Sequence, residues 1–256
     1  MSGHPPTQTT DGLFARAREI LRQSHKPDDF LWARWVSRPF AALALAALRR
    51  VPMTPNAISL VSLGVGLLSA LAYGFWPGWT GLWIAWSVGQ LAYIIDCMDG
   101  MQARARGLHS PAGTAMDFLV DAIKQMLLFP AIAYRVWVEA GQPLGLVQGW
   151  ALWAAILSGP IVAAGLALTV FLRSGEVTGE VQRQQRADHD STPAGRVMAG
   201  FAFLMNYPSW ILVPVIFQRM DLFLIISLPL YAAYCAHALR LVWKRVCGFD
   251  HYAGRD

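Results

Sequence analysis

Four aspartates lie in two pairs at spacings that suit metal-dependent chemistry. Asp96 and Asp99 are three residues apart, and Asp117 and Asp121 are four residues apart. On a helix the members of each pair share a face, so two such faces meeting would gather four carboxylates into one pocket. Carboxylates in or beside membrane spans are costly unless they pair, face a cavity or hold a cation. The cluster therefore requires positive charge.

Two sources of positive charge suit these carboxylates. The side chains of Arg104, Arg106 and Lys124 are near in the sequence, and hard carboxylate oxygens also suit magnesium or manganese. Two such cations about 3.5 to 4 Å apart can neutralise a phosphate, orient it for in-line attack and stabilise the leaving oxygen. Gly100 and Gly113 lack side chains, which lets a nucleotide or pyrophosphate approach the backbone. Arg104, one turn beyond Gly100, is placed to bind a phosphate through two N–H groups.

The elements that position these residues are predicted to be membrane helices. Of 256 residues, 55% are hydrophobic and 14% are charged, and the mean hydropathy is +0.38, whereas about a quarter of the residues of a soluble domain are charged. Apolar runs of about twenty residues recur, and tryptophans near their ends resemble an aromatic belt. Three cysteines without paired spacing indicate neither a disulfide framework nor a zinc site. The basic residues are spread over several connections, which argues against nucleic-acid binding.

We predict an all-α integral membrane protein with six transmembrane helices. Thr54-Pro55-Asn56 opens the first span, and Trp76-Pro77-Gly78-Trp79 closes it as a turn. The expected spans are residues 54–75, 81–96, 113–138, 146–172, 196–218 and 222–243. The expected regions are an N-terminal tail with interfacial helices at 1–50, a transmembrane domain at 51–245 and a cytoplasmic tail at 246–256.

Two segments before the first span are predicted to lie at the membrane surface. A helix beginning near Asp11 has an apolar face that includes Leu13 and Ile20, with arginines elsewhere. Packing of this helix against the rest of the protein explains the pattern equally well. The segment from Phe30 to Arg50 is broken at Pro39 and is too short beyond it to span a bilayer.

The distribution of arginine and lysine predicts the orientation. The N-terminal region, the link at 97–112, the loop at 173–195 and the Lys244-Arg245 tail are basic, whereas the other three links hold little positive charge. By the positive-inside rule, both termini and the aspartates face the cytoplasm. In a bacterium this would be the inner membrane.

The motif Asp96-x2-Asp99-Gly100-x2-Ala103-Arg104-x8-Gly113-x3-Asp117-x3-Asp121 resembles, at every position, the signature of the CDP-alcohol phosphotransferase family. The resemblance implies a homodimer in which each subunit binds a CDP-linked donor and divalent cations. It implies that Asp96, Asp99 and Asp117 are metal ligands and that Asp121 both contacts metal and acts as the base. Pro55-Asn56-x2-Ser59 is similar to the family element that contacts the nucleotide, although a helix cap explains Asn56 and Ser59 almost as well.

The resemblance implies transfer of a substituted phosphate group with release of CMP. We expect CDP-diacylglycerol to donate a phosphatidyl group to a small alcohol, because the chain resembles the compact phospholipid synthases of the family. Transfer of a head group from a soluble CDP-alcohol to diacylglycerol is the alternative. An intramembrane prenyltransferase is a less favoured alternative. Such enzymes also carry paired aspartates, but they have no need for Gly100, Ala103-Arg104 and Gly113 at these spacings. An ion carrier would have carboxylates nearer mid-membrane and inverted repeats.

The residues that select the acceptor are less well defined. We expect Lys124 to neutralise the aspartates rather than bind the acceptor. Positive charge in the 173–195 loop and just after it suits an anionic acceptor. A cytoplasmic loop is also expected to be basic by the positive-inside rule alone. The candidates are Arg183, Arg186 and Arg196. Asn206 and Tyr207, just before Pro208, either line the acceptor path or satisfy the broken backbone of a kink. We interpret Asp188 and His189 as part of a solvated loop.

Overall fold

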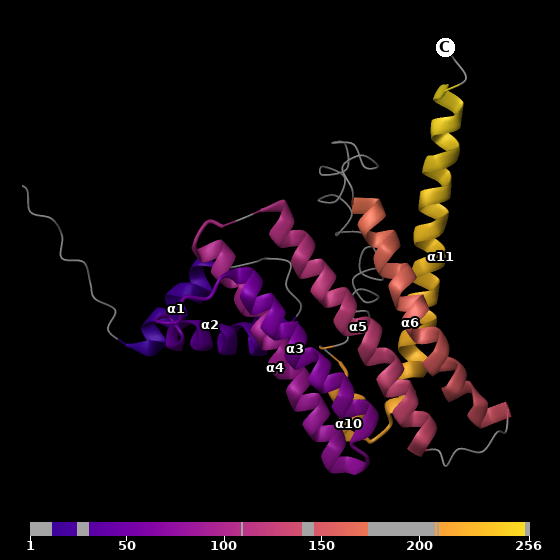
Figure 1. Ribbon diagram of the computed structural model, residues 1–256, viewed down its shortest axis with the longest axis horizontal. Helices are drawn as coiled ribbons and strands as arrows, with labels where there is room; N and C mark the ends of the chain where they lie inside the picture. Colours follow the sequence, from indigo (N-terminus) through magenta and orange to yellow (C-terminus); the bar gives the residue numbers. More distant parts are fainter. Residues whose placement is uncertain are drawn as a thin grey trace, which may run out of the picture. The chain divides into compact units, whose positions relative to one another are not determined.

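The computed structural model describes residues 12–24, 31–108, 110–139, 146–173, 208 and 210–253. Every regular element among these residues is helical, which confirms the all-α prediction. Figure 1 shows the elements in chain order. Their bounds are α1 (Leu13–Gln23), the π-helical segment η1 (Ala33–Ser37), α2 (Arg38–Ala47), α3 (Pro55–Phe75), α4 (Gly78–Ala105), α5 (Pro111–Glu139), α6 (Leu146–Arg173), α10 (Leu212–Ile216) and α11 (Met220–Ala253).

Four of the described helices are long and apolar enough to cross a membrane. They are α3, α4, the Gly149–Leu168 part of α6 and the Met220–Trp243 part of α11. α5 is about as long as α4 and α6, but it carries five charged residues and is not among the four. The span predicted at 196–218 lies largely outside the described residues, and its described end forms only the short α10. The count of six spans therefore stays a prediction.

Two helices extend beyond the predicted spans, because a helix can continue beyond its apolar stretch. The second span was expected to end near Asp96, but α4 continues to Ala105, so Arg104 lies in its last turn rather than in a link. Gly107, at φ +65°, ends α4 with a Schellman motif, in which Leu108 N–H donates to Ala103 O at 2.8 Å. Similarly, α11 runs through most of the expected C-terminal tail. Pro39 lies in the first turn of α2 and does not break the segment.

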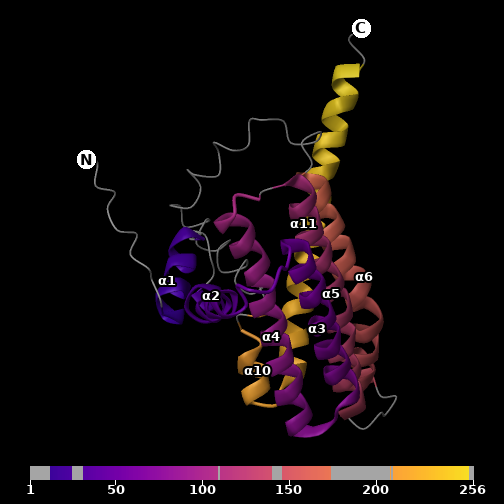
Figure 2. The same cartoon turned by 60° about the vertical axis from the view of Figure 1, so that its left-hand side comes forward.

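The chain divides into two compact units, and the first consists of Met1–Val65 with Gln90–Val120. In this unit α1 packs against α2, and both views show the two helices side by side (Figures 1 and 2). Small side chains permit the close approach, since Ala17 of α1 and Ala41 and Ala42 of α2 are buried in one apolar cluster. On its exposed side, hydrogen bonds from Arg22 and Gln23 hold the pKa of the Glu19 carboxyl below its usual value. The predicted helix near residue 11 is thus present, while its place at the membrane surface stays a prediction.

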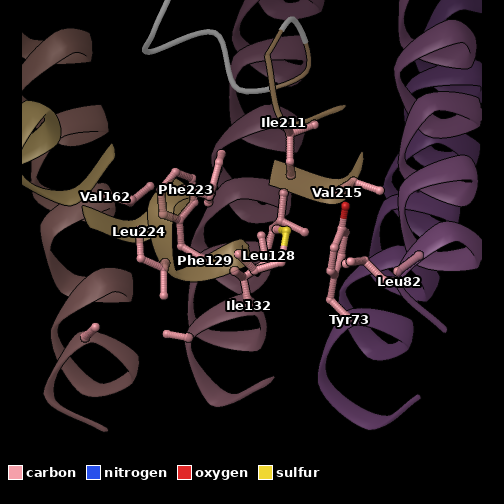
Figure 3. Packing of buried hydrophobic residues seen from close by; sticks show 14 of the residues in the cluster. Tyr73, Leu82, Leu128, Phe129, Ile132, Val162, Ile211, Val215, Phe223 and Leu224 are labelled. Atoms are coloured by element: carbon pink, nitrogen blue, oxygen red, sulfur yellow. The ribbon is translucent and has the colours of Figure 1, made fainter. Parts of the chain in front are cut away.

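The second unit consists of Gly66–Gly89 with Asp121–Asp256, and its core combines aliphatic with aromatic side chains (Figure 3). The ring of Phe129 on α5 lies 5.3 Å from that of Phe223 and 5.2 Å from that of Tyr231, both on α11. α6 packs along α11 in the same unit. Arg135, only 3% exposed at its side chain, donates to the carbonyls of Trp76 and Gly78 at 2.9 and 2.6 Å. It thereby fixes the turn between α3 and α4.

Lys124 of α5 lies against the backbone of α3 at Gly66. A Cβ added at Gly66 would lie 2.8 Å from Lys124 Cγ and Cδ. Lys124 is buried and its Nζ lies 2.8 Å from Asp121 Oδ1. The glycine therefore makes room for the aliphatic part of a buried lysine, and it fixes where the ammonium group meets Asp121.

Replacing Gly66 with alanine should lower the melting temperature of the purified protein, whereas Gly64→Ala should leave it unchanged or raise it. Overpacking costs about 1–3 kcal/mol, which corresponds to about 2–4 °C per kcal/mol. A Cβ at Gly64 would meet nothing within 4 Å, and alanine is the better helix former. Thermal unfolding of both variants in the same detergent measures the difference. Equal melting temperatures would contradict the steric argument.

Candidate active site

Three of the four motif aspartates converge in the first unit. Asp96 and Asp99 lie one turn apart near the end of α4, and Asp117 lies in the second turn of α5. Each offers one carboxylate oxygen such that the three oxygens lie within 4.8 Å of one another. Asp99 is buried, Asp96 is half-buried and Asp117 is exposed. The group thus extends from the protein interior to an accessible surface.

Two serines of α3 contact the aspartates of α4. Ser59 donates to Asp99 Oδ2, and the Ser62 hydroxyl lies 3.3 Å from Asp96 Oδ1 and 3.0 Å from Ala92 O. Both serines are buried. Ser59 was predicted to contact the nucleotide, and here its hydroxyl is directed at a carboxylate. Ser62 was not predicted, although two small polar residues three apart on one face of an apolar helix were a readable signal.

A cavity of about 340 Å³ lies beside this cluster, where the starts of α3 and α5 meet the end of α4. Its wall contains Thr54, Pro55, Asn56, Ser59, Asp99, Gly100, Ala103, Arg104, Leu108, Ser110, Gly113, Thr114 and Asp117. Among the residues predicted for the site, the wall lacks Asp96 and Asp121. Helix N-termini favour negative charge, and α3 and α5 each direct one toward the cavity. Thr54, Ser110 and Thr114 were not predicted from the sequence to line the site.

Local capping explains how the ends of α3 and α5 are held. Thr54 Oγ1 accepts the Ala57 N–H at 3.2 Å, and Ser110 Oγ accepts the Gly113 N–H at 2.9 Å. In both helices the residue after the cap is proline, which suits the first helical position because no hydrogen bond is needed there. Both caps are thus readable in the sequence, since they follow the N-cap preference for serine and threonine.

The two motif glycines leave space in the wall of the cavity. A Cβ at Gly100 would lie 3.2 and 3.4 Å from Arg104 Nη1 and Nη2, so the guanidinium lies against the bare backbone of Gly100. A Cβ at Gly113 would lie 3.1 Å from Ser110 Oγ and 3.9 Å from Asn56 Oδ1. Glycine at both positions therefore keeps arginine, serine and asparagine groups close to the cavity backbone.

The fourth aspartate has a different partner. Asp121 follows Asp117 by one turn of α5, and it pairs with Lys124 at 2.8 Å with its side chain 45% exposed. It belongs to the second unit. This ion pair agrees with the expectation that Lys124 neutralises a carboxylate. The residues proposed for the acceptor lie outside the described residues: Arg183, Arg186, Arg196, Asn206 and Tyr207, as do Asp188 and His189.

The donor set of the cluster fits a divalent cation. Three carboxylates this close repel one another, and a bound divalent cation would remove that repulsion. All three ligand atoms are hard oxygens, the type that magnesium and manganese prefer. The Ser59 hydrogen bond orients Asp99, as partners of metal-binding side chains commonly do. Asp96, Asp99 and Asp117 could therefore bind a metal ion.

Comparison with known proteins gives two findings. The model of the family described as CDP-alcohol phosphatidyltransferase matches residues 52–227, which is more than half of the chain. An uncharacterized CDP-alcohol phosphatidyltransferase class-I family protein of Schizosaccharomyces pombe is 32% identical over 106 residues. That alignment covers 38% of this chain and 27% of the yeast protein, so the chain matches about a quarter of its relative's length.

Proposed function

Because the chain belongs to the CDP-alcohol phosphatidyltransferase family, we propose that it transfers a phosphatidyl group from CDP-diacylglycerol to a small alcohol and releases CMP. The four apolar helices among the described residues, together with the family, support an integral membrane protein. The observation that carries the proposal is the cavity wall that Asp99, Asp117, Gly100 and Arg104 share. Carboxylates for a cation, bare backbone and a guanidinium are the groups that a nucleoside diphosphate requires.

We assign the donor-binding roles as follows. Asp96, Asp99 and Asp117 hold magnesium or manganese, with two ions per site and Asp121 contributing a ligand. When bound, the cations neutralise the diphosphate and stabilise the leaving oxygen. Arg104 binds the diphosphate. Asn56, Ser59, Ala103, Gly100 and Gly113 form the surface on which the nucleotide lies, and Ser59 also orients Asp99.

Asp121 is the proposed base. As the acceptor oxygen forms a bond to the phosphorus that carries the diacylglycerol, the bond from this phosphorus to the oxygen of CMP breaks. The hydroxyl proton moves to Asp121 and the bonding electrons leave with CMP. A carboxylate within hydrogen-bond reach of the hydroxyl suits this role. The Lys124 ion pair holds one oxygen of Asp121 in place and leaves the second carboxylate oxygen for the proton.

Assembly and orientation complete the proposal. We propose a homodimer, with both termini and the aspartates on the cytoplasmic side, since the links at that side carry the basic residues. Arg106, in the turn after α4, and Arg104, in its last turn, are two of these residues. Topology mapping with cysteines placed at the two ends of α3 would test the orientation.

Purified protein in lipid, given labelled CDP-diacylglycerol, magnesium and a panel of alcohols, should release CMP with at least one alcohol. The panel should include polyol phosphates, because the 173–195 loop is basic. Omission of the divalent cation should abolish release. Release of CMP only from CDP-choline or CDP-ethanolamine with diacylglycerol would instead support the reverse transfer. Absence of release with every pair of substrates would refute the proposal.

A further inference from the structure

The C-terminal end of α1 contacts the active-site arginine. Ser24, which caps α1, is fully buried, and its backbone N–H and hydroxyl both donate to Ile20 O at 3.0 and 2.7 Å. Its own carbonyl accepts two guanidinium groups. Arg38 donates through Nη1 at 2.9 Å, and Arg104 donates through Nε at 3.2 Å. One backbone oxygen thus joins α1, the start of α2 and the end of α4.

This contact determines how Arg104 presents its guanidinium. The group is planar and rigid, so a hydrogen bond at Nε limits the rotation of the whole plane. Its other two nitrogens, Nη1 and Nη2, lie beside Gly100, and both residues line the cavity. With Nε directed at Ser24, the edge formed by Nη1 and Nη2 is the one placed for a bidentate contact with phosphate.

The position of the Ser24 carbonyl is itself fixed by packing. α1 packs on α2 through Ala17 and Ala41, and Arg38 is only 7% exposed. A basic side chain at a helix C-terminus is ordinary, because it offsets the helix dipole. The guanidinium of Arg38, at the start of α2, is sufficient to offset the dipole at this end of α1. The second donor comes from a residue 80 positions away in the sequence that also lines the cavity, and the helix dipole does not require it.

We propose that α1 positions Arg104 for the donor diphosphate through the Ser24 carbonyl, and that Arg38 is a positioning residue because it holds that carbonyl in place. This inference rests on the proposed function, since it assumes a CDP-linked donor. It assigns α1 a role in donor binding that packing alone would not require. Arg38 is not part of the cavity wall, and its contact with Ser24 O links it to Arg104, which is part of that wall.

CDP binding to the full-length protein in nanodiscs with magnesium tests the proposal, and Arg34→Gln is the matched control. Arg34 is exposed and lies one turn before Arg38. Arg38→Gln should weaken CDP binding about two- to tenfold, the typical effect of one hydrogen bond, and Arg34→Gln should not. Arg38→Lys should restore part of the affinity, because an ammonium group can still donate to Ser24 O.

A double-mutant cycle separates positioning from general damage to the fold. In an Arg104→Gln background, Arg38→Gln should have no further effect on CDP affinity if it acts through Arg104. An equal loss in both backgrounds would overturn the proposal, and so would equal affinities of Arg38→Gln and Arg34→Gln. Failure of the wild-type protein to bind CDP would instead refute the proposed function.

Discussion

Replacing Asp99 with asparagine should lower the rate of CMP release by about a thousandfold, because a metal ion contributes several kcal/mol of charge stabilisation and each ~1.4 kcal/mol changes the rate tenfold. Asparagine has the same shape and can still accept the Ser59 hydrogen bond but lacks the negative charge. Asp99 is the most buried of the three clustered carboxylates. Its replacement therefore removes a negatively charged metal ligand at the position where a water molecule can least easily take its place.

The dependence of CMP release on divalent cation concentration measures this effect. The control is Asp221→Asn, which removes an equal charge from an aspartate that pairs with Arg219 at 2.7 Å. Ser59→Ala should lie between the two, since loss of a group that orients a metal ligand typically weakens metal binding about 10- to 100-fold. If Asp99→Asn keeps the rate and the metal dependence of the wild type, Asp99 does not bind the metal.

The bounds of α3 could be read from the sequence because its signals are local. Thr54 supplies a cap, Pro55 suits the first helical position, and the Trp76-Pro77-Gly78 turn follows Phe75. The end of α4 was missed for the opposite reason: the apolar run stops near Asp96, but the helix does not. Gly107 was the stop signal, and it lies eleven residues beyond the point where hydropathy changes.

The motif residues of the site were predictable, while the residues that hold them were not. The motif spacing identified Asp96, Asp99 and Asp117, and the structure brings their oxygens together. Contacts such as Ser62 with Asp96, or Ser24 with Arg104, join segments 34 and 80 residues apart. Helical periodicity shows which face a residue occupies but not which helix that face meets. Such pairs depend on tertiary packing, which one sequence does not specify.

Replacing Asp121 with asparagine should lower kcat about 10²- to 10⁴-fold, the usual contribution of a general base. If the residue acts mainly as the base, the concentrations of donor and of divalent cation that give half-maximal rate should change little. In the structure Asp121 pairs with Lys124 at 2.8 Å. Single-turnover rates measured across a series of cation concentrations separate an effect on proton transfer from an effect on metal binding.

The effect of Asp121→Asn on the half-saturating cation concentration decides between the two roles assigned to Asp121, metal ligand and base. If Asp121→Asn lowers kcat and raises the half-saturating cation concentration together, the residue acts mainly as a ligand. If only kcat falls, the base assignment stands. Lys124→Met provides the comparison, because it leaves the carboxylate intact and removes the ammonium group that pairs with it. Its kcat should therefore fall less than that of Asp121→Asn, and a larger loss would mean that the lysine acts on the substrates directly.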